Sequence, residues 1–284
     1  MSERNFRALL EKKWEEGKFL CIGLDSEFEK IPEAARERSV RETIVGFNRA
    51  IVDATKDLVC AYKPNPAFYE VYGDEGWKAL RETIQYILEA APEVPVILDA
   101  KRGDIGNTNK GYAESAFTHL RVDAITVHPY FGSEALSEFF EWTEKGIIVL
   151  CKSSNSGSGE IQNLKVDGTS IGQSASEPLY KLIARLIAGA WNAKGNACIM
   201  VGATYPEELA EVREIVGGMP ILIPGIGAQN GDIEKTVQAG KDARGRGMII
   251  SAARAVIFAS SGADFAKAAS EKARELDSAI RKAL

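Results

Sequence analysis

Short apolar segments alternate with longer amphipathic segments along the whole chain. The apolar segments are rich in Val, Ile and Leu and have the length of buried strands, whereas the segments between them have the spacing of helices that bury one face. The predicted strands are 18–25, 58–63, 94–98, 124–128, 146–152, 197–202, 221–224 and 248–251. The predicted helices are 39–57, 77–91, 108–120, 134–144, 177–193, 206–216 and 232–239, followed by a closing helical region.

This alternation predicts a parallel sheet with crossover helices. Eight strand–helix units in 284 residues match a TIM barrel in number and size, whereas an open doubly wound sheet usually has fewer strands. A charged amphipathic segment, MSERNFRALLEKKWEEGK, precedes the first strand. We therefore predict an α/β fold, a (β/α)8 TIM barrel with an N-terminal extra helix, formed as a single domain over residues 1–284.

Composition narrows the classes of partner. A net charge of -5 argues against a nucleic-acid surface, although a local positive site for a phosphate remains possible. No apolar run is long enough to cross a membrane, so we expect no membrane partner. The four cysteines lie inside strand-like segments without metal-site spacing, which predicts buried thiols in a soluble, cytoplasmic protein.

The third predicted strand ends in charged residues, in the sequence PVILDAKRGDIGNT from Pro95. Side chains alternate along a strand, so Asp99 and Lys101 should share one face, and Asp104 follows after a turn at Gly103. Two carboxylates would then bracket one ammonium, an arrangement that can donate a proton and repel an anion. A structural ion pair that caps the strand is the alternative. Thr108 is the expected N-cap of the next helix.

Other strand ends also carry polar residues, as expected if a site lies at the carboxyl face of the barrel. They are Asp25, Lys63, Lys152, Ser153, Ser154 and Arg254. Glycine-rich residues 224–232 follow the seventh strand and Arg254 follows the eighth, where TIM barrels commonly bind phosphate through backbone N–H groups and a guanidinium. The Ser- and Gly-rich connection 153–176 is far longer than an ordinary loop, which suggests a lid or a disordered insert. No spacing indicates a metal, and His128 is expected only to fix its loop.

Five motifs together resemble the orotidine 5'-phosphate decarboxylase family, and most closely its longer bacterial branch. The similarity extends from the first strand to Arg254, and the Asp-x-Lys-x-x-Asp core and the Gly-Ala-Gln loop are its most specific parts. The motifs are GLD at 23–25, KPNPAFYE at 63–70, DAKRGDIGNT at 99–108, KSSN at 152–155 and PGIGAQ at 224–229.

The resemblance implies cofactor-independent decarboxylation of orotidine 5'-phosphate to UMP and CO2, the last step of de novo pyrimidine biosynthesis, by a homodimer with shared active sites. Lys101 would be the proton donor to C6, and Asp99, Asp104 and Lys63 its charged partners. Asp104, Ile105 and Thr108 would reach the neighbouring subunit's site. The substrate-binding residues would be Asp25 at the ribose, Ser154 at the pyrimidine, and Gln229 and Arg254 at the phosphate, with Gly225, Gly227 and Ala228 in the phosphate loop.

Two other functions remain open on the sequence. A magnesium-dependent keto-sugar-phosphate decarboxylase would share the Asp-x-Lys-x-x-Asp strand, but Lys63 and Ser154 disfavour it. A non-catalytic phosphate-binding barrel is disfavoured by the intact Lys101 between two carboxylates.

Overall fold

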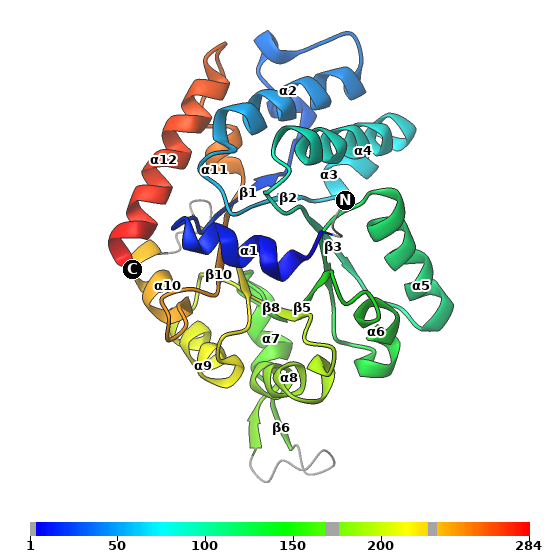
Figure 1. Cartoon of the computed structure of the whole chain (residues 1–284), viewed down its shortest axis with the longest axis vertical. Coiled ribbons are helices and arrows are strands. Elements are labelled where there is room, and N and C mark those ends of the chain that lie inside the picture. Colours follow the sequence, from blue (N-terminus) through cyan, green and yellow to red (C-terminus); the bar gives the residue numbers. More distant parts are fainter. Residues whose placement is uncertain (1–3, 168–175, 227–231) are drawn as a thin grey trace.

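A computed structural model describes residues 4–167, 176–226 and 232–284 of the chain. Eight parallel strands form one sheet in the order β2-β1-β10-β9-β8-β5-β4-β3, and helices surround it (Figure 1). The predicted TIM barrel is therefore confirmed. The strands are β1 (Leu20–Leu24), β2 (Ala61–Pro64), β3 (Ile97–Arg102), β4 (Ala124–Val127), β5 (Gly146–Lys152), β8 (Ala197–Val201), β9 (Ile221–Pro224) and β10 (Met248–Ala252).

The barrel closes between β2 and β3, where the pairing is shortest. A single parallel bridge joins Tyr62 to Val96, and the Tyr62 N–H donates to the Pro95 carbonyl at 3.0 Å. Pro95 lacks an N–H of its own, which limits how far this ladder can extend. Neighbouring strands elsewhere pair over two to five residues.

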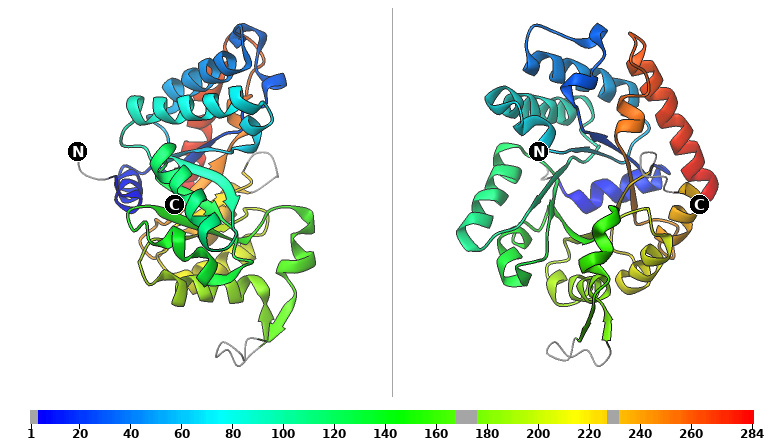
Figure 2. Two further views of the ribbon diagram at one scale, coloured as in Figure 1. Left: turned by 90° about the vertical axis from the view of Figure 1, so that its right-hand side faces the viewer. Right: turned by 180° about the vertical axis from the view of Figure 1, so that it is seen from behind.

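The helices form the outer layer, as Figures 1 and 2 show. They are α1 (Phe6–Glu15), α2 (Val40–Thr55), α3 (Ala67–Glu70), α4 (Gly73–Ala90), α5 (Gly106–Glu114), α6 (Gly132–Phe140), α7 (Gly159–Gln162), α8 (Leu179–Ala188), α9 (Pro206–Val216), α10 (Ile233–Gly240), α11 (Arg254–Ile257) and α12 (Phe265–Ala283). Side-chain caps define three of the starts, since Asn5, Ser39 and Asp232 each accept a hydrogen bond from a first-turn N–H. Among the described residues, no helix is long and apolar enough to cross a bilayer.

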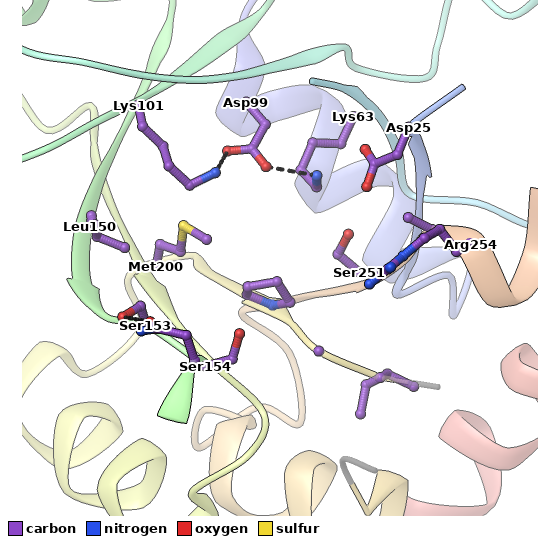
Figure 3. Close-up of a pocket in the computed structure, with 15 residues that line it drawn as sticks. Asp25, Lys63, Asp99, Lys101, Leu150, Ser153, Ser154, Met200, Ser251 and Arg254 are labelled. Carbon is purple, nitrogen blue, oxygen red and sulfur yellow. Dashed lines mark hydrogen bonds and ion pairs between the residues drawn. The ribbon is translucent and has the colours of Figure 1, made fainter. Parts of the chain in front are cut away.

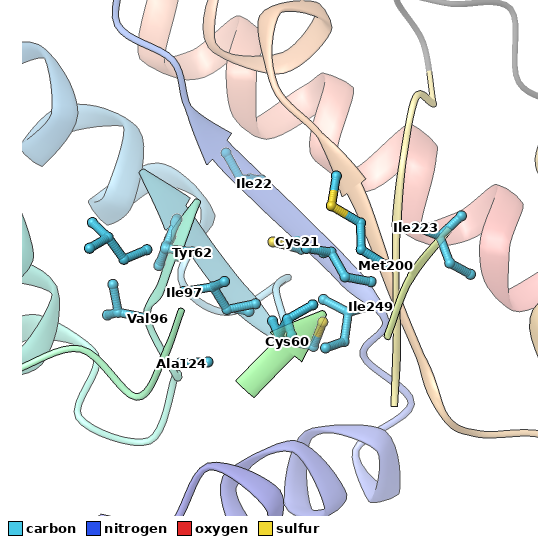
Figure 4. Packing of buried hydrophobic residues seen from close by; sticks show 14 of the residues in the cluster. Cys21, Ile22, Cys60, Tyr62, Val96, Ile97, Ala124, Met200, Ile223 and Ile249 are labelled. Atoms are coloured by element: carbon cyan, nitrogen blue, oxygen red, sulfur yellow. The ribbon is translucent and has the colours of Figure 1, made fainter. Parts of the chain in front are cut away.

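The interior is apolar because the strands are buried on both faces. Figure 4 shows Cys21, Cys60, Ile97 and Ile249 packed together inside the barrel, and none of the four is exposed. All four cysteines of the chain are buried and free, as the sequence predicted. Each aliphatic side chain in such a core contributes about 1.5–3 kcal/mol through burial.

Helix α1 covers the amino-terminal ends of the strands. The Trp14 indole N–H donates to the carbonyl of Met248, the first residue of β10, at 2.8 Å. Phe6 packs on Gly146 at the start of β5, where a Cβ would lie 2.2 Å from the Phe6 ring. The predicted extra helix therefore closes one end of the barrel, and the carboxyl ends of the strands are left for a site.

Two predictions about the third unit were wrong. The predicted range of the strand, 94–98, is too early: β3 is Ile97–Arg102, so Asp99 and Lys101 lie within it, and Arg102 pairs with Val127 of β4. Thr108 is not an N-cap, because α5 begins at Gly106 and the Thr108 N–H already donates to the Ile105 carbonyl. Gly106 has a φ of +42°, so the chain turns into the helix two residues earlier than the sequence suggested.

The described part of the long connection 153–176 has secondary structure of its own. A 3-10 turn (Ser156–Ser158) leads into α7, and β6 (Lys165–Asp167) pairs antiparallel with β7 (Ser176–Pro178). The hairpin projects outward beyond α8, as Figures 1 and 2 show. The described part is therefore not an irregular insert, and a lid role for the connection stays a prediction.

Candidate active site

A cavity of about 440 Å³ opens at the carboxyl ends of the strands. It collects side chains from most of the barrel strands, which come together only because the sheet is closed. The predicted site residues that line it are Asp25, Lys63, Asp99, Lys101, Ser154, Gly225 and Arg254. Figure 3 shows Lys101 and Lys63 approaching Asp99 from opposite sides, with Arg254 on one side of the cavity and Ser154 on the other.

Asp99 is the centre of the charged cluster. Its carboxylate accepts from Lys63 Nζ at 2.9 Å and from Lys101 Nζ at 2.7 Å, one ammonium on each oxygen. The Thr126 hydroxyl donates to the same oxygen as Lys101, at 3.0 Å. The Lys63 side chain is 5% exposed and that of Asp99 6%, whereas that of Lys101 is 41% exposed. Lys101 is thus the ammonium that a ligand can reach.

The pKa shifts follow from this arrangement. Burial opposes ionisation of Asp99, but attraction to Lys63 and Lys101 outweighs it and holds the pKa of Asp99 well below its usual range. Burial likewise disfavours the charged form of Lys63, and attraction to Asp99 and Asp25 raises its pKa above the ordinary value. The cavity therefore has a fixed negative charge at Asp99 at any physiological pH.

The backbone at Lys101 is unusual. Its φ is +47°, a left-handed conformation that is costly for a residue with a side chain. The Lys101 N–H donates to the Thr126 hydroxyl at 2.9 Å instead of to a strand carbonyl. The pairing of β3 with β4 is irregular over the same residues, between Leu98 and Arg102. Thr126 supports both the backbone of Lys101 and the carboxylate of Asp99, a role that sequence reasoning missed.

Asp25 occupies the end of the cavity nearer Arg254 in Figure 3. One of its oxygens, Oδ1, is buried without a hydrogen-bond partner among the described residues. Burial raises the pKa of Asp25, while attraction to Lys63 works in the opposite direction. A buried acceptor without a donor is costly, so a bound ligand with hydroxyl groups would satisfy it.

The structure describes only some of the residues that the sequence predicts at the phosphate. Gly225 lines the cavity with a φ of +114°, a conformation that favours glycine, and Arg254 begins α11. The predicted residues Gly227, Ala228 and Gln229 lie outside the described residues. Sequence reasoning also missed apolar lining residues, of which Leu150 and Met200 are examples. Their position near strand ends was the available signal.

Three predicted residues do not line this cavity. Asp104 accepts a hydrogen bond from the Ile105 N–H at 2.7 Å, Ile105 is 61% exposed, and Thr108 is exposed on α5. Among the residues that the structure describes, no ion pair joins Asp104 to Lys101. The predicted bracketing of Lys101 by two carboxylates is therefore not formed within one chain, because the turn after β3 carries Asp104 away from the cavity.

Lys152 and His128 also lie outside the lining. The Lys152 side chain points to the other side of β5 and is 1% exposed. The Tyr130 N–H donates to His128 Nδ1 at 3.4 Å, so His128 fixes its own loop, as expected. Its Nε2 also lies 3.2 Å from the Gly103 carbonyl, in the turn after β3. Within the described ranges, no cluster of three His, Cys, Asp or Glu side chains has the arrangement of a metal site.

Comparisons with known proteins identify the family of the chain. Residues 18–269 match the model of the Orotidine 5'-phosphate decarboxylase / HUMPS family. The orotidine 5'-phosphate decarboxylase of Cellvibrio japonicus is 48% identical over 250 residues, which are 88% of each chain. The structure of Leishmania donovani OMP decarboxylase is 38% identical with a TM-score of 0.81, covering 98% of this chain and 99% of that chain. The structure of Leishmania donovani UMP synthase has a TM-score of 0.83 at 38% identity, and the match covers 98% of this chain and 57% of that longer one. The chain therefore belongs to the orotidine 5'-phosphate decarboxylase / HUMPS family.

Proposed function

We propose that the cavity catalyses the decarboxylation of orotidine 5'-phosphate to UMP and CO2, without a cofactor, as the last step of de novo pyrimidine biosynthesis. The observation that carries the proposal is the pairing of the accessible Lys101 ammonium with Asp99, at 2.7 Å, inside the cavity. The family match and the curated relatives support the same reaction. A single TIM-barrel domain would carry it as a carbon–carbon lyase.

The chemistry needs an electrostatic catalyst. When the bond between C6 and the carboxylate breaks, its electron pair stays on C6 in the plane of the ring, where the ring cannot delocalise it. An ammonium beside C6 stabilises this charge and then transfers a proton to C6, and the neutral amine regains a proton from water. The bond of 2.7 Å by which Asp99 holds Lys101 Nζ at the cavity supports this role for Lys101.

Asp99 would act on the substrate carboxylate. Its pKa is held low although burial opposes ionisation, so it stays negative beside the group that leaves as CO2. The repulsion is relieved as CO2 departs, and the attraction between Lys101 and the new carbanion grows. Lys63 would keep Asp99 charged and in place through its 2.9 Å bond.

Binding energy from the rest of the substrate would supply much of the barrier reduction. The barrier must fall by on the order of 20 kcal/mol, near the upper part of the range for enzymes. Arg254 would clamp the phosphate with the loop that contains Gly227, Ala228 and Gln229, and the orphan oxygen of Asp25 would accept from a ribose hydroxyl. Ser154, at the other side of the cavity, would read the pyrimidine edge.

We also propose a homodimer with shared active sites. Asp104 lies outside its own cavity, and the neighbouring loops expose apolar side chains: Ile105 is 61% exposed, Phe131 52% and Tyr130 87%. A contiguous two-fold contact through these loops would cover the apolar surface and carry Asp104, Ile105 and Thr108 to the partner's cavity. The buried free cysteines fit a cytoplasmic enzyme, and the net charge of -5 fits a small-molecule substrate better than nucleic acid.

Incubation of the protein with orotidine 5'-phosphate tests the proposal directly. The expected result is a time-dependent change of the pyrimidine absorbance, with UMP and CO2 as products and the same rate after EDTA treatment. UMP binding without turnover would favour a non-catalytic phosphate-binding barrel. Activity on a keto-sugar phosphate that EDTA abolishes would favour the magnesium-dependent decarboxylase.

A further inference from the structure

Lys152 is a buried strand-end residue to which the proposed reaction assigns no role. It is the last residue of β5, and its side chain is 1% exposed although it does not line the cavity. Its Nζ donates to Asn163 Oδ1 at 2.6 Å and lies 3.4 Å from Glu208 Oε2. The ammonium thus ties β5 to the residue after α7 and to α9.

Two aromatic rings complete the surroundings of this ammonium. Lys152 Nζ lies 5.6 Å from the ring centroid of Tyr180 and 5.4 Å from that of Tyr205. A buried ammonium is costly unless its partners hold it closely, and cation–π contacts gain strength where water is excluded. We call Lys152, Asn163, Tyr180, Tyr205 and Glu208 the Lys152 cluster. Removal of one strong partner should therefore disturb the whole cluster.

A second set of hydrogen bonds joins the neighbours of Lys152 and Asn163, which are Ser153 and Gln162. The Ser153 N–H donates to Gln162 Oε1 at 2.9 Å, and Gln162 Nε2 donates to the Ser153 hydroxyl at 2.9 Å. The Ser153 hydroxyl donates in turn to Asn155 Oδ1 at 2.7 Å. Lys152–Asn163 and Ser153–Gln162 are therefore adjacent links between the same two segments, the end of β5 and the end of α7.

The segment held by these links is one wall of the cavity. Ser153, Ser154 and Asn155 all line it. Behind this wall, a Cβ on Gly202 would lie only 2.6 Å from Ser154 Cβ, and the Thr204 hydroxyl donates to the Ser154 carbonyl at 3.3 Å. Ser154 thus sits with little free space against the residues that follow β8, so its position depends on how residues 152–155 are anchored on the other side.

We propose that Lys152 is a positioning residue that, through Asn163, sets the placement of Ser154 at the pyrimidine end of the cavity. The proposal rests on the proposed function, because it assumes that Ser154 contacts the base of the nucleotide. Lys152 does not touch the substrate. Its loss should weaken recognition of the base and leave the phosphate and ribose contacts at Arg254 and Asp25 unchanged, since Arg254 begins α11 and Asp25 follows β1, and neither belongs to the segment that Lys152 anchors.

Two ligands separate these effects: UMP, which has the base, and ribose 5-phosphate, which lacks it. Calorimetric titration of Lys152→Met and Asn163→Ala should show UMP binding weaker by about tenfold, as expected for one misplaced hydrogen bond. Ribose 5-phosphate should bind within about twofold of its wild-type affinity. Asn163→Asp should restore UMP binding, because a carboxylate oxygen can accept from the same ammonium.

The controls keep folding separate from positioning. Lys152 is buried, so Lys152→Met could fail to fold. Asn163 is exposed, so Asn163→Ala leaves the core intact and tests the same link. Lys194→Met removes an exposed lysine that pairs with Glu141 at 3.1 Å, and it should change neither affinity. Equal weakening of both ligands by Asn163→Ala, or unchanged UMP affinity, would overturn the positioning role. A wild-type protein that fails to convert orotidine 5'-phosphate would instead reject the proposed function.

Discussion

Lys63 and Lys101 bind the same carboxylate, yet removal of Lys63 should cost far more stability than removal of Lys101. Lys63→Met takes away the ammonium that is 5% exposed, and Lys101→Met the one that is 41% exposed. The two bonds have nearly equal lengths, 2.9 Å and 2.7 Å, so distance does not distinguish them. The two ion pairs differ instead in their exposure to water, which screens the charges of the Lys101–Asp99 pair more than those of the Lys63–Asp99 pair.

Coulomb's law gives the scale of that difference. At 2.9 Å, with an effective dielectric constant of about 20 for a buried pair, the attraction between Lys63 and Asp99 is about 6 kcal/mol. With water screening, the 2.7 Å pair at Lys101 is worth about 1.5 kcal/mol before side-chain entropy is subtracted. Lys63→Met also leaves a buried carboxylate short of a partner. We therefore expect Lys63→Met to lower the free energy of unfolding by about 3–5 kcal/mol, and Lys101→Met by less than about 1 kcal/mol.

Urea denaturation at one fixed subunit concentration measures this difference, and activity on orotidine 5'-phosphate is measured on the same samples. Lys101→Met should be nearly as stable as the wild type, should bind UMP and should not decarboxylate. The loss of stability in Lys63→Met should depend on pH. Because the pKa of Asp99 is lower in the folded state than its unfolded value of about 4, its ionised form stabilises the fold above that unfolded pKa, and this contribution is lost as pH falls through the folded pKa. Equal destabilisation by the two substitutions, or a few percent of wild-type turnover in Lys101→Met, would refute the reasoning.

Three other experiments test the remaining roles. Arg254→Ala should lower kcat/KM far more for orotidine 5'-phosphate than for orotidine, and equal losses on the two substrates would exclude a phosphate contact. Mixing Lys101→Ala subunits with Asp104→Ala subunits should restore roughly a quarter of wild-type activity, because about half of the dimers are mixed and one of the two sites in each mixed dimer is intact. No recovery after demonstrated subunit exchange would reject the shared site. Asp25→Asn should raise the free energy of unfolding by about 1 kcal/mol near neutral pH and should lower the activity. Burial raises the pKa of Asp25, so the folded state loses stability as pH rises through the folded pKa and the carboxyl ionises, whereas Asn carries no charge. A thermal midpoint below that of the wild type would contradict this sign.

The sequence by itself determined the barrel, because each unit carries its own signal. Buried parallel strands must be apolar on both faces and helices on one, so the two patterns alternate eight times whatever the distant contacts are. Charges at strand ends were equally visible, since a closed barrel gathers those ends at one face. Asp25, Lys63, Asp99, Lys101, Ser154 and Arg254 could therefore be assigned to one cavity before any coordinates were known.

Only the tertiary structure decided which way individual side chains point. Leu150 lines the cavity, and strict alternation would direct Lys152 to the same side. The pairing of β5 with β8 shifts register between these two residues, and Lys152 instead enters the cluster with Asn163. Likewise, the turn after β3 carries Asp104 away from Lys101. Such shifts depend on the register of neighbouring strands and on contacts between residues far apart in the chain, which no local pattern of hydrophobic and polar residues encodes.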